Sequence, residues 1–231
     1  MSKGILVFCE LADGAFKKTA YELLGKASEL SAQVGGSISA VVLSPEGGDF
    51  ASLGKYGAVN VYHGSVDTNN AGEATRAIQK AIEESGAKVI LSSTSSQAKE
   101  IFPRLSARLK AGLGAEVTEL SFVDGQVVGK RPQFAGKVFS EVRILSEKQL
   151  FPVRGGSFVA PVAGSGSANV QNLDVSFEDV DSATKIVEVI QSEASVVDLT
   201  EAERIVSGGR SVKSKENYDS LIRTLASSLG A

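Results

Sequence analysis

Residues 5–43 read ILVFCELADGAFKKTAYELLGKASELSAQVGGSISAVVL. The apolar run Ile5 to Phe8 precedes a stretch, Phe16 to Val34, whose apolar residues recur at helical spacing. Gly35-Gly36 ends this helix, and Ile38 to Leu43 is a second apolar run. The pattern predicts a buried strand, a crossover helix and another buried strand, which is the unit that builds parallel sheets.

The same alternation continues toward the middle of the chain. Val59 to Tyr62 and Lys88 to Ser92 are strand-like, and a helix that ends at Gly86 lies between them. A further helix carries apolar residues from Ile101 to Leu109, with Pro103 expected in its first turn or at a kink. The order predicts an α/β fold with a mostly parallel sheet flanked by helices.

The periodicity changes after Glu116. Four strand-like segments follow with no room for long helices between them: Val117 to Phe122, Gln126 to Arg131, Val138 to Ile144 and Leu150 to Val159. We expect these segments to be antiparallel strands or hairpins added to the sheet.

The last third contains the expected domain boundary. Gly164 to Gly166 is interpreted as a loop, because the glycine spacing of a dinucleotide fingerprint is incomplete there. Ile186 to Ile190 is a further predicted strand. We therefore predict an amino-terminal α/β domain over 1–191, a linker over 192–200 and the start of a second α/β domain over 201–231.

That second part begins with the short apolar run Arg204 to Ser207 and continues with Gly208-Gly209-Arg210. A helix with the apolar residues Tyr218, Leu221, Ile222, Leu225 and Leu229 follows, and Gly230 is its expected end. The sequence predicts a strand, a glycine turn and an amphipathic helix. This two-element unit cannot bury its apolar face alone.

Composition and single residues exclude several classes of function. The chain carries 24 Lys and Arg against 27 Asp and Glu, so it lacks the basic excess of nucleic-acid binding proteins. With one cysteine, Cys9, and one histidine, His63, neither an intrachain disulfide nor a Cys/His metal site is expected. The apolar run Ile5 to Cys9 is too short for a signal peptide or membrane span, so we expect a cytoplasmic protein without direct membrane insertion.

No catalytic residue is predicted. The chain has neither a G-x-S-x-G elbow nor a Gly-Lys pair followed by Ser or Thr. His63 is interpreted as a surface or structural histidine, and Cys9 as a buried, inert thiol. The Ser/Thr loop Ser92 to Ser96 follows a strand, where α/β sheets hold ligands, but a helix-capping loop has the same composition.

Gly208-Gly209-Arg210 is the most promising candidate for a binding site. Two glycines allow the backbone to pass close to a ligand, and an arginine there can meet a phosphate or a flavin ring. The amino terminus of the following helix offers free amides to an anion. The spacing suits a dinucleotide, although a plain turn has the same residues.

Taken together, the residues resemble the alpha subunit of electron transfer flavoprotein. The matching segments cover essentially the whole chain: Pro103 to Leu109, Arg131 to Lys137, Phe151 to Phe158, Asp198-Leu199-Thr200 and Val206 to Arg210. The resemblance implies an amino-terminal α/β domain that contacts a beta subunit and a carboxyl-terminal domain that holds most of an FAD. Arg210 matches the family arginine that contacts FAD, and it is the one cofactor-binding residue assigned.

In that family the heterodimer is an electron carrier rather than an enzyme with its own substrate. It accepts electrons from primary dehydrogenases, often the acyl-CoA dehydrogenases of fatty acid beta-oxidation, and passes them to a quinone oxidoreductase. The family's later Ser-Arg, Gly-Gln-Thr-Gly and Gly-Ile-Ser-Gly-Ala-like segments do not occur before Ala231. We therefore expect most of the FAD site to lie outside these residues.

Two other functions stay open. One is a non-catalytic module that only binds the beta subunit. The other is an unrelated nucleotide-binding domain that uses the loop Ser92 to Ser96.

Overall fold

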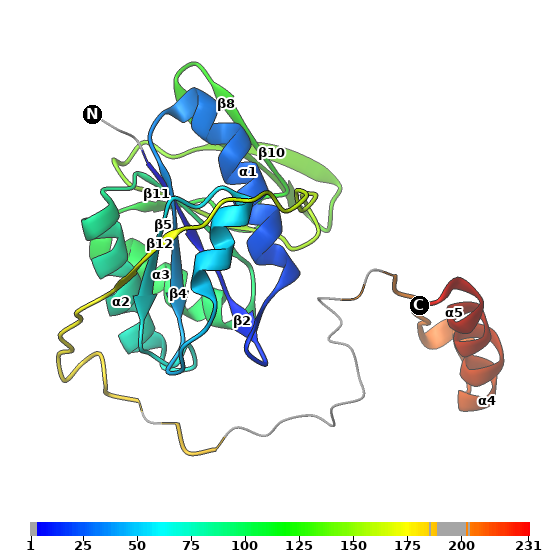
Figure 1. Ribbon diagram of the computed structural model, residues 1–231. Helices are drawn as coiled ribbons and strands as arrows, with labels where there is room; N and C mark the ends of the chain where they lie inside the picture. Colours follow the sequence, from blue (N-terminus) through cyan, green and yellow to red (C-terminus); the bar gives the residue numbers. More distant parts are fainter. Residues whose placement is uncertain (1–3, 185, 189–201, 203) are drawn as a thin grey trace. The chain divides into compact units, whose positions relative to one another are not determined.

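The computed structural model of the chain describes residues 4–184, 186–188, 202 and 204–231 (Figure 1). The chain divides into two units, Met1–Val187 and Glu188–Ala231, and each is considered by itself. The boundary expected at residue 191 and the linker expected over 192–200 lie outside the described residues.

A seven-stranded parallel sheet forms the centre of the first unit. In spatial order its strands are β12 (Asn169–Asn172), β5 (Asn60–Gly64), β4 (Ile38–Leu43), β1 (Ile5–Phe8), β6 (Val89–Ser93), β11 (Gln149–Val153) and β7 (Gly112–Leu113). The mostly parallel sheet predicted from the sequence is confirmed.

Helices cover both faces of this sheet because side chains of a strand alternate between its faces. Ile5 and Val7 of β1 pack on the side of α1 (Lys18–Val34) and the 3₁₀ helix η1 (Phe50–Tyr56). The next side chain, Leu6, packs on the opposite side. There α2 (Ala71–Ser85) and α3 (Ser96–Leu109) complete the core, and Figure 1 shows α1 and α2 on opposite sides of the sheet.

The helices begin and end at capping residues that can be recognised in the sequence. Gly35 and Gly86 both have positive φ, 76° and 65°, and cap α1 and α2. At the start of α3 the Ser95 hydroxyl accepts a hydrogen bond from the Ala98 backbone N–H at 3.0 Å. Pro103 lies inside α3 rather than in its first turn.

The expected antiparallel strands are present, but they form a separate sheet. Strands β8 (Glu119–Val123), β9 (Gln126–Gln133) and β10 (Val138–Arg143) pair in the order β10-β9-β8. The turn Asp124-Gly125 joins the first two, with φ of 51° and 79°. Such turns suit the twist of a hairpin.

The predicted strand Leu150 to Val159 was wrong in length and in direction. Only β11 is a strand, and it runs parallel between β6 and β7 in the main sheet. Its residues 150–153 are buried, which is typical of a strand covered on both faces. The strand ends before the turn at Gly156, where φ is 73°.

A small hairpin that the sequence did not reveal follows β1. It consists of β2 (Leu11–Ala12) and β3 (Ala15–Phe16), joined by Asp13-Gly14 with positive φ at both residues. It places the chain at the start of α1.

The segment before β12 crosses η1 at very close range. Gly164 donates its N–H to the Lys55 carbonyl at 2.8 Å, so the predicted loop at Gly164 to Gly166 is confirmed. A Cβ at Gly54 would lie 2.3 Å from the backbone N of Ala168. Only glycine allows this approach.

In the second unit, the elements within the described stretch 204–231 are all helical. It contains η2 (Arg210–Val212), α4 (Lys215–Asn217), the π-helical segment η3 (Tyr218–Arg223) and α5 (Thr224–Leu229). Gly230, with φ of 62°, caps α5 as predicted.

Two strands were predicted for this end of the chain, and neither is seen in its described residues. Arg204 to Ser207 pairs with no strand in the part of the chain that the structure describes, so the predicted strand is wrong there. A short apolar run forms a strand only where a partner supplies the ladder hydrogen bonds. Of the predicted strand Ile186 to Ile190, residues 186–188 are described and are not in a strand, and residues 189–190 lie outside the described residues. None of the helices in the described ranges is long and apolar enough to cross a membrane.

Candidate functional site

Gly208-Gly209-Arg210 lies beside a shallow hollow of about 420 Å³ in the second unit. Gly209, Arg210, Val212, Lys213, Ser214, Lys215 and Tyr218 line it. The glycine turn and the start of the helical run thus contribute to one shallow concave surface.

Hydrogen bonds between residues close in sequence hold the backbone around the hollow in place. Ser214 caps the helical run, because its hydroxyl accepts from the Asn217 backbone N–H at 3.2 Å. The Asn217 side chain donates to the Val212 carbonyl at 3.0 Å. Gly208 permits close packing, since a Cβ there would lie 2.9 Å from the Ile222 side chain.

The lining of the hollow carries three cations and one aromatic ring. Arg210, Lys213 and Lys215 supply the positive charge, and Tyr218 supplies the ring. Arginine and lysine bind phosphate oxygens, and a ring can stack on another ring or on a guanidinium. The hollow is chemically suited to an anionic ligand that contains a ring system.

His63 has the structural role that the sequence favoured. Its Nε2 lies 3.0 Å from the Ser44 carbonyl and its Nδ1 lies 3.1 Å from Asn172 Oδ1. The ring also packs against Phe50, with 4.7 Å between centroids. Both ring nitrogens are engaged, so His63 links β5 to β12 and is not poised as a general base.

Cys9 is buried, as predicted. Its side chain is fully buried at the end of β1. Burial raises the pKa of the thiol well above its usual range, and the neighbouring charge of Glu10 raises it further. Cys9 is therefore a small core residue rather than a nucleophile.

The loop Ser92 to Ser96 binds the carboxylate of Glu10, which no sequence motif indicates. Glu10 follows β1 and is only 5% exposed. The Ser95 hydroxyl donates to its Oε1 at 2.5 Å, and the Ser93 hydroxyl donates to its Oε2. The loop therefore caps α3 and also binds a side chain of the same chain.

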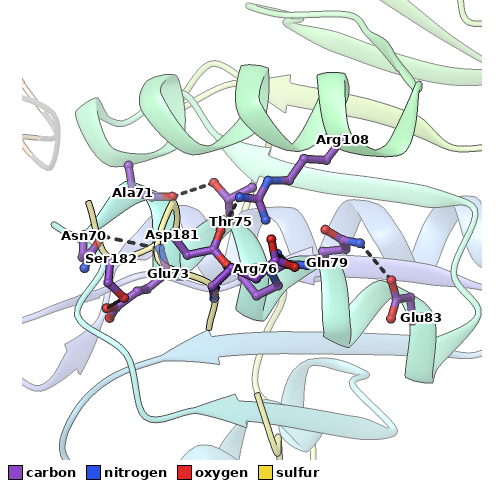
Figure 2. A network of polar contacts seen from close by, with 11 residues as sticks. Asn70, Ala71, Glu73, Thr75, Arg76, Gln79, Glu83, Arg108, Asp181 and Ser182 are labelled. Atoms are coloured by element: carbon purple, nitrogen blue, oxygen red, sulfur yellow. Dashed lines mark hydrogen bonds and ion pairs between the residues drawn. The ribbon is translucent and has the colours of Figure 1, made fainter. Parts of the chain in front are cut away.

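A second polar cluster that sequence reasoning missed is centred on Asp181 (Figure 2). Arg76 Nε of α2 donates to its Oδ2 at 2.8 Å, and Arg108 Nη2 of α3 donates to its Oδ1. The Glu178 backbone N–H adds a third bond at 3.0 Å. Asp181 joins the two helices to the segment after β12.

The Asp181 carboxylate interacts strongly with its arginine partners because its side chain is fully buried. Burial by itself would raise the pKa of Asp181. The hydrogen bonds from Glu178, Arg108 and Arg76 outweigh it and lower the pKa to about 2. No ligand group is required to satisfy these atoms, so the cluster is an anchor of the fold rather than a binding site.

A comparison with protein families shows the family to which this chain belongs. A family model described as the electron transfer flavoprotein domain matches residues 5–178, which is most of the first unit. The chain belongs to the electron transfer flavoprotein family. The resemblance found in the sequence is thereby confirmed.

Curated relatives place the chain among the alpha subunits of this family. It is 31% identical to "Electron transfer flavoprotein subunit alpha" of Bacillus subtilis (strain 168), over 100% of this chain and 71% of that protein. It is 29% identical to "Protein FixB" of Clostridium saccharobutylicum, over 99% of this chain and 70% of the relative.

A third relative has a more specific name. The "Lactate dehydrogenase (NAD(+),ferredoxin) subunit LctC" of Acetobacterium woodii is 29% identical, over 99% of this chain and 56% of its own length. The hollow at Arg210 lies beyond residue 178 and therefore outside the family-model match. It lies within the part covered by these relatives.

Proposed function

We propose that this alpha-type chain binds FAD and carries electrons in a heterodimer with a beta subunit. It accepts them from flavin dehydrogenases, such as acyl-CoA dehydrogenases, and passes them through a quinone oxidoreductase to the quinone pool. Membership of the electron transfer flavoprotein family supports the electron-carrier role. The same proposal includes a cytoplasmic location and a division into an amino-terminal domain over 1–191 and an FAD-binding part over 201–231.

One observation supports a flavin cofactor in the second unit: the concentration of cations around a single hollow. Arg210, Lys213 and Lys215 would hold the negatively charged diphosphate of FAD. Tyr218 would pack against a ring of the cofactor. The flavin supplies the redox chemistry when bound, and the side chains bind and orient it.

Among the residues of this hollow, Arg210 is the one to which we assign the main contact with the cofactor. It follows directly after two glycines, so a ligand can approach the backbone closely at this point. Its planar guanidinium can bind two phosphate oxygens at once or lie flat against a ring, whereas Lys213 and Lys215 act as point charges.

The proposal is tested by FAD binding. The chain is co-purified with its beta subunit, supplied with FAD, and examined by visible absorption and by flavin titration. Arg210→Ala should weaken FAD binding by about tenfold or more, because it removes charge-assisted hydrogen bonds. The matched control is Arg223→Ala, which removes an exposed arginine of the same unit that pairs with Asp219 at 3.0 Å.

The outcomes separate the alternatives. Equal FAD affinity in the two variants would remove Arg210 from the site. A stable complex with the beta subunit that retains no flavin would favour the non-catalytic module. Binding of an adenine nucleotide without flavin would favour the nucleotide-binding domain.

The antiparallel sheet of the first unit is the surface we assign to the beta subunit. Three large apolar side chains are exposed around the β9–β10 turn: Phe134 (75%), Val138 (51%) and Phe139 (55%). β10 is also an edge strand of its sheet. An edge with exposed apolar side chains is suited to protein association.

A further inference from the structure

The parallel sheet has one position where its winding reverses. From β1 the chain proceeds through β4 to β5 on one side, and then continues through β6 on the other side of β1. The crevice at the carboxyl ends of β1 and β6 is therefore a topological switch point, the place where open α/β sheets bind their ligands.

A side chain of this protein fills the crevice. Glu10 comes two residues after the end of β1, and Ser93 is the last residue of β6. Both carboxylate oxygens of Glu10 accept hydroxyl hydrogen bonds, one from Ser93 and one from Ser95. The ammonium group of Lys17 lies 3.9 Å from Oε1, so a cation also faces the carboxylate.

These donors are the groups that bind phosphate in other proteins. Ser95 is the N-cap of the 14-residue helix α3, so the Glu10 carboxylate lies at a helix amino terminus, which favours negative charge. Two hydroxyls, one ammonium group and a helix amino terminus form a complete set for an anion. The anion that they hold is Glu10.

We infer that Glu10 is an internal anion that occupies the switch-point site and excludes the phosphate of a nucleotide from the first unit. Two effects cause the exclusion. The carboxylate fills the position of the phosphate and uses its donors, and its negative charge repels a second anion. A nucleotide would have to displace a carboxylate that is 95% buried, since its exposure is 5%.

This inference is independent of where the flavin binds. It concerns only the first unit, whereas Arg210 belongs to the second. It predicts that Glu10 sets the ligand specificity of the amino-terminal α/β domain, and that the domain has a latent phosphate site beneath this side chain.

The test removes the internal anion and offers an external one. Glu10→Ala leaves the hydroxyls of Ser93 and Ser95 without their acceptor, so inorganic phosphate should restore the lost bonds. The thermal midpoint of this variant, measured in the full chain, should rise with phosphate at constant ionic strength set by chloride. Its apparent phosphate affinity should exceed that of the unchanged chain by at least tenfold.

Two controls locate the effect. Glu22→Gln changes another buried carboxylate of the first unit, which accepts from the Gly156 N–H at 3.0 Å, and should show no gained response to phosphate. Adding Lys17→Met to Glu10→Ala should cancel the gain, because the external phosphate would lose its cation.

Each outcome is decisive. If Glu10→Ala responds to phosphate no more than the unchanged chain does, the inference is wrong. If the variant is unfolded without phosphate, refolding by added phosphate is the expected result, and failure to refold counts against it. Phosphate or AMP that shifts the amide NMR signals of residues 93–98 in the unchanged chain would also overturn it, because the site would then be open.

Discussion

Asp181→Asn should destabilise the first unit in a way that depends on pH. The carboxylate is fully buried and binds Arg76 and Arg108, which belong to different helices. Its pKa falls from the usual 3.8 to about 2 in the folded chain. At about 1.4 kcal/mol per pKa unit, the charge of Asp181 contributes roughly 2–3 kcal/mol at neutral pH.

The direction of the pH dependence follows from the lowered pKa. Because the folded state holds the Asp181 proton less tightly than the unfolded state, the stabilisation is complete above pH 3.8 and is lost as the pH falls toward 2. The free energy of unfolding should differ between the unchanged chain and the variant by roughly 2–3 kcal/mol at pH 6 and by about half as much at pH 3.

Urea unfolding followed by far-UV circular dichroism measures this difference, because most of the regular structure belongs to the first unit. The control is Glu147→Gln, which breaks the exposed pair with Lys88, 3.1 Å apart, and should change the stability very little. A difference between Asp181→Asn and the unchanged chain that is the same at pH 3 and pH 6 would refute the reasoning. The loss would then come from packing and not from charge.

Three further predictions concern other parts of the chain. Gly72→Ala should lower the free energy of unfolding by roughly 1–3 kcal/mol in the same urea assay, because its Cβ would lie 2.1 Å from the Asp181 carbonyl; Gly47→Ala, with open space around it, should change it by less than about 0.5 kcal/mol. Cys9 should not react with a thiol reagent in the folded chain and should react fully in denaturant, since its side chain is 0% exposed; reaction of the folded chain would contradict the inert assignment. Phe139→Glu should weaken binding of the beta subunit by at least tenfold in calorimetry, whereas Val162→Glu, at a side chain that is 95% exposed, should not; equal affinities would exclude the β9–β10 turn from the interface.

The sequence predicted elements well where local pattern and burial agree. β1, β4 and α1 lie almost exactly where the apolar runs and glycine stops placed them, because strands buried on both faces are continuous apolar runs. β11 shows the limit of this reasoning. Its apolar run carries no information about direction, and the parallel pairing with β6 depends on a chain path that periodicity does not encode.

The candidate sites differ in the same way, because one is formed by neighbours in the sequence and two are formed by residues far apart in it. The hollow at Arg210 is built from neighbours in sequence, so a motif could indicate it. Glu10 binds a serine 83 positions away, and Asp181 binds an arginine 105 positions away. Single acidic residues in loops are common, and only the folded topology shows which of them are buried beside a donor.

β12 has a consequence for the synthesis of the chain. It pairs with β5 across 109 positions, so the edge of β5 stays uncovered until β12 has left the ribosome. At about 5–20 residues per second, the delay is roughly 5–20 s. An uncovered edge can pair with another nascent chain. The short polar strand Asn169–Asn172 then covers the edge of β5, so another chain can no longer pair with it. Because this strand is short and polar, its own outer edge is a poor template for aggregation.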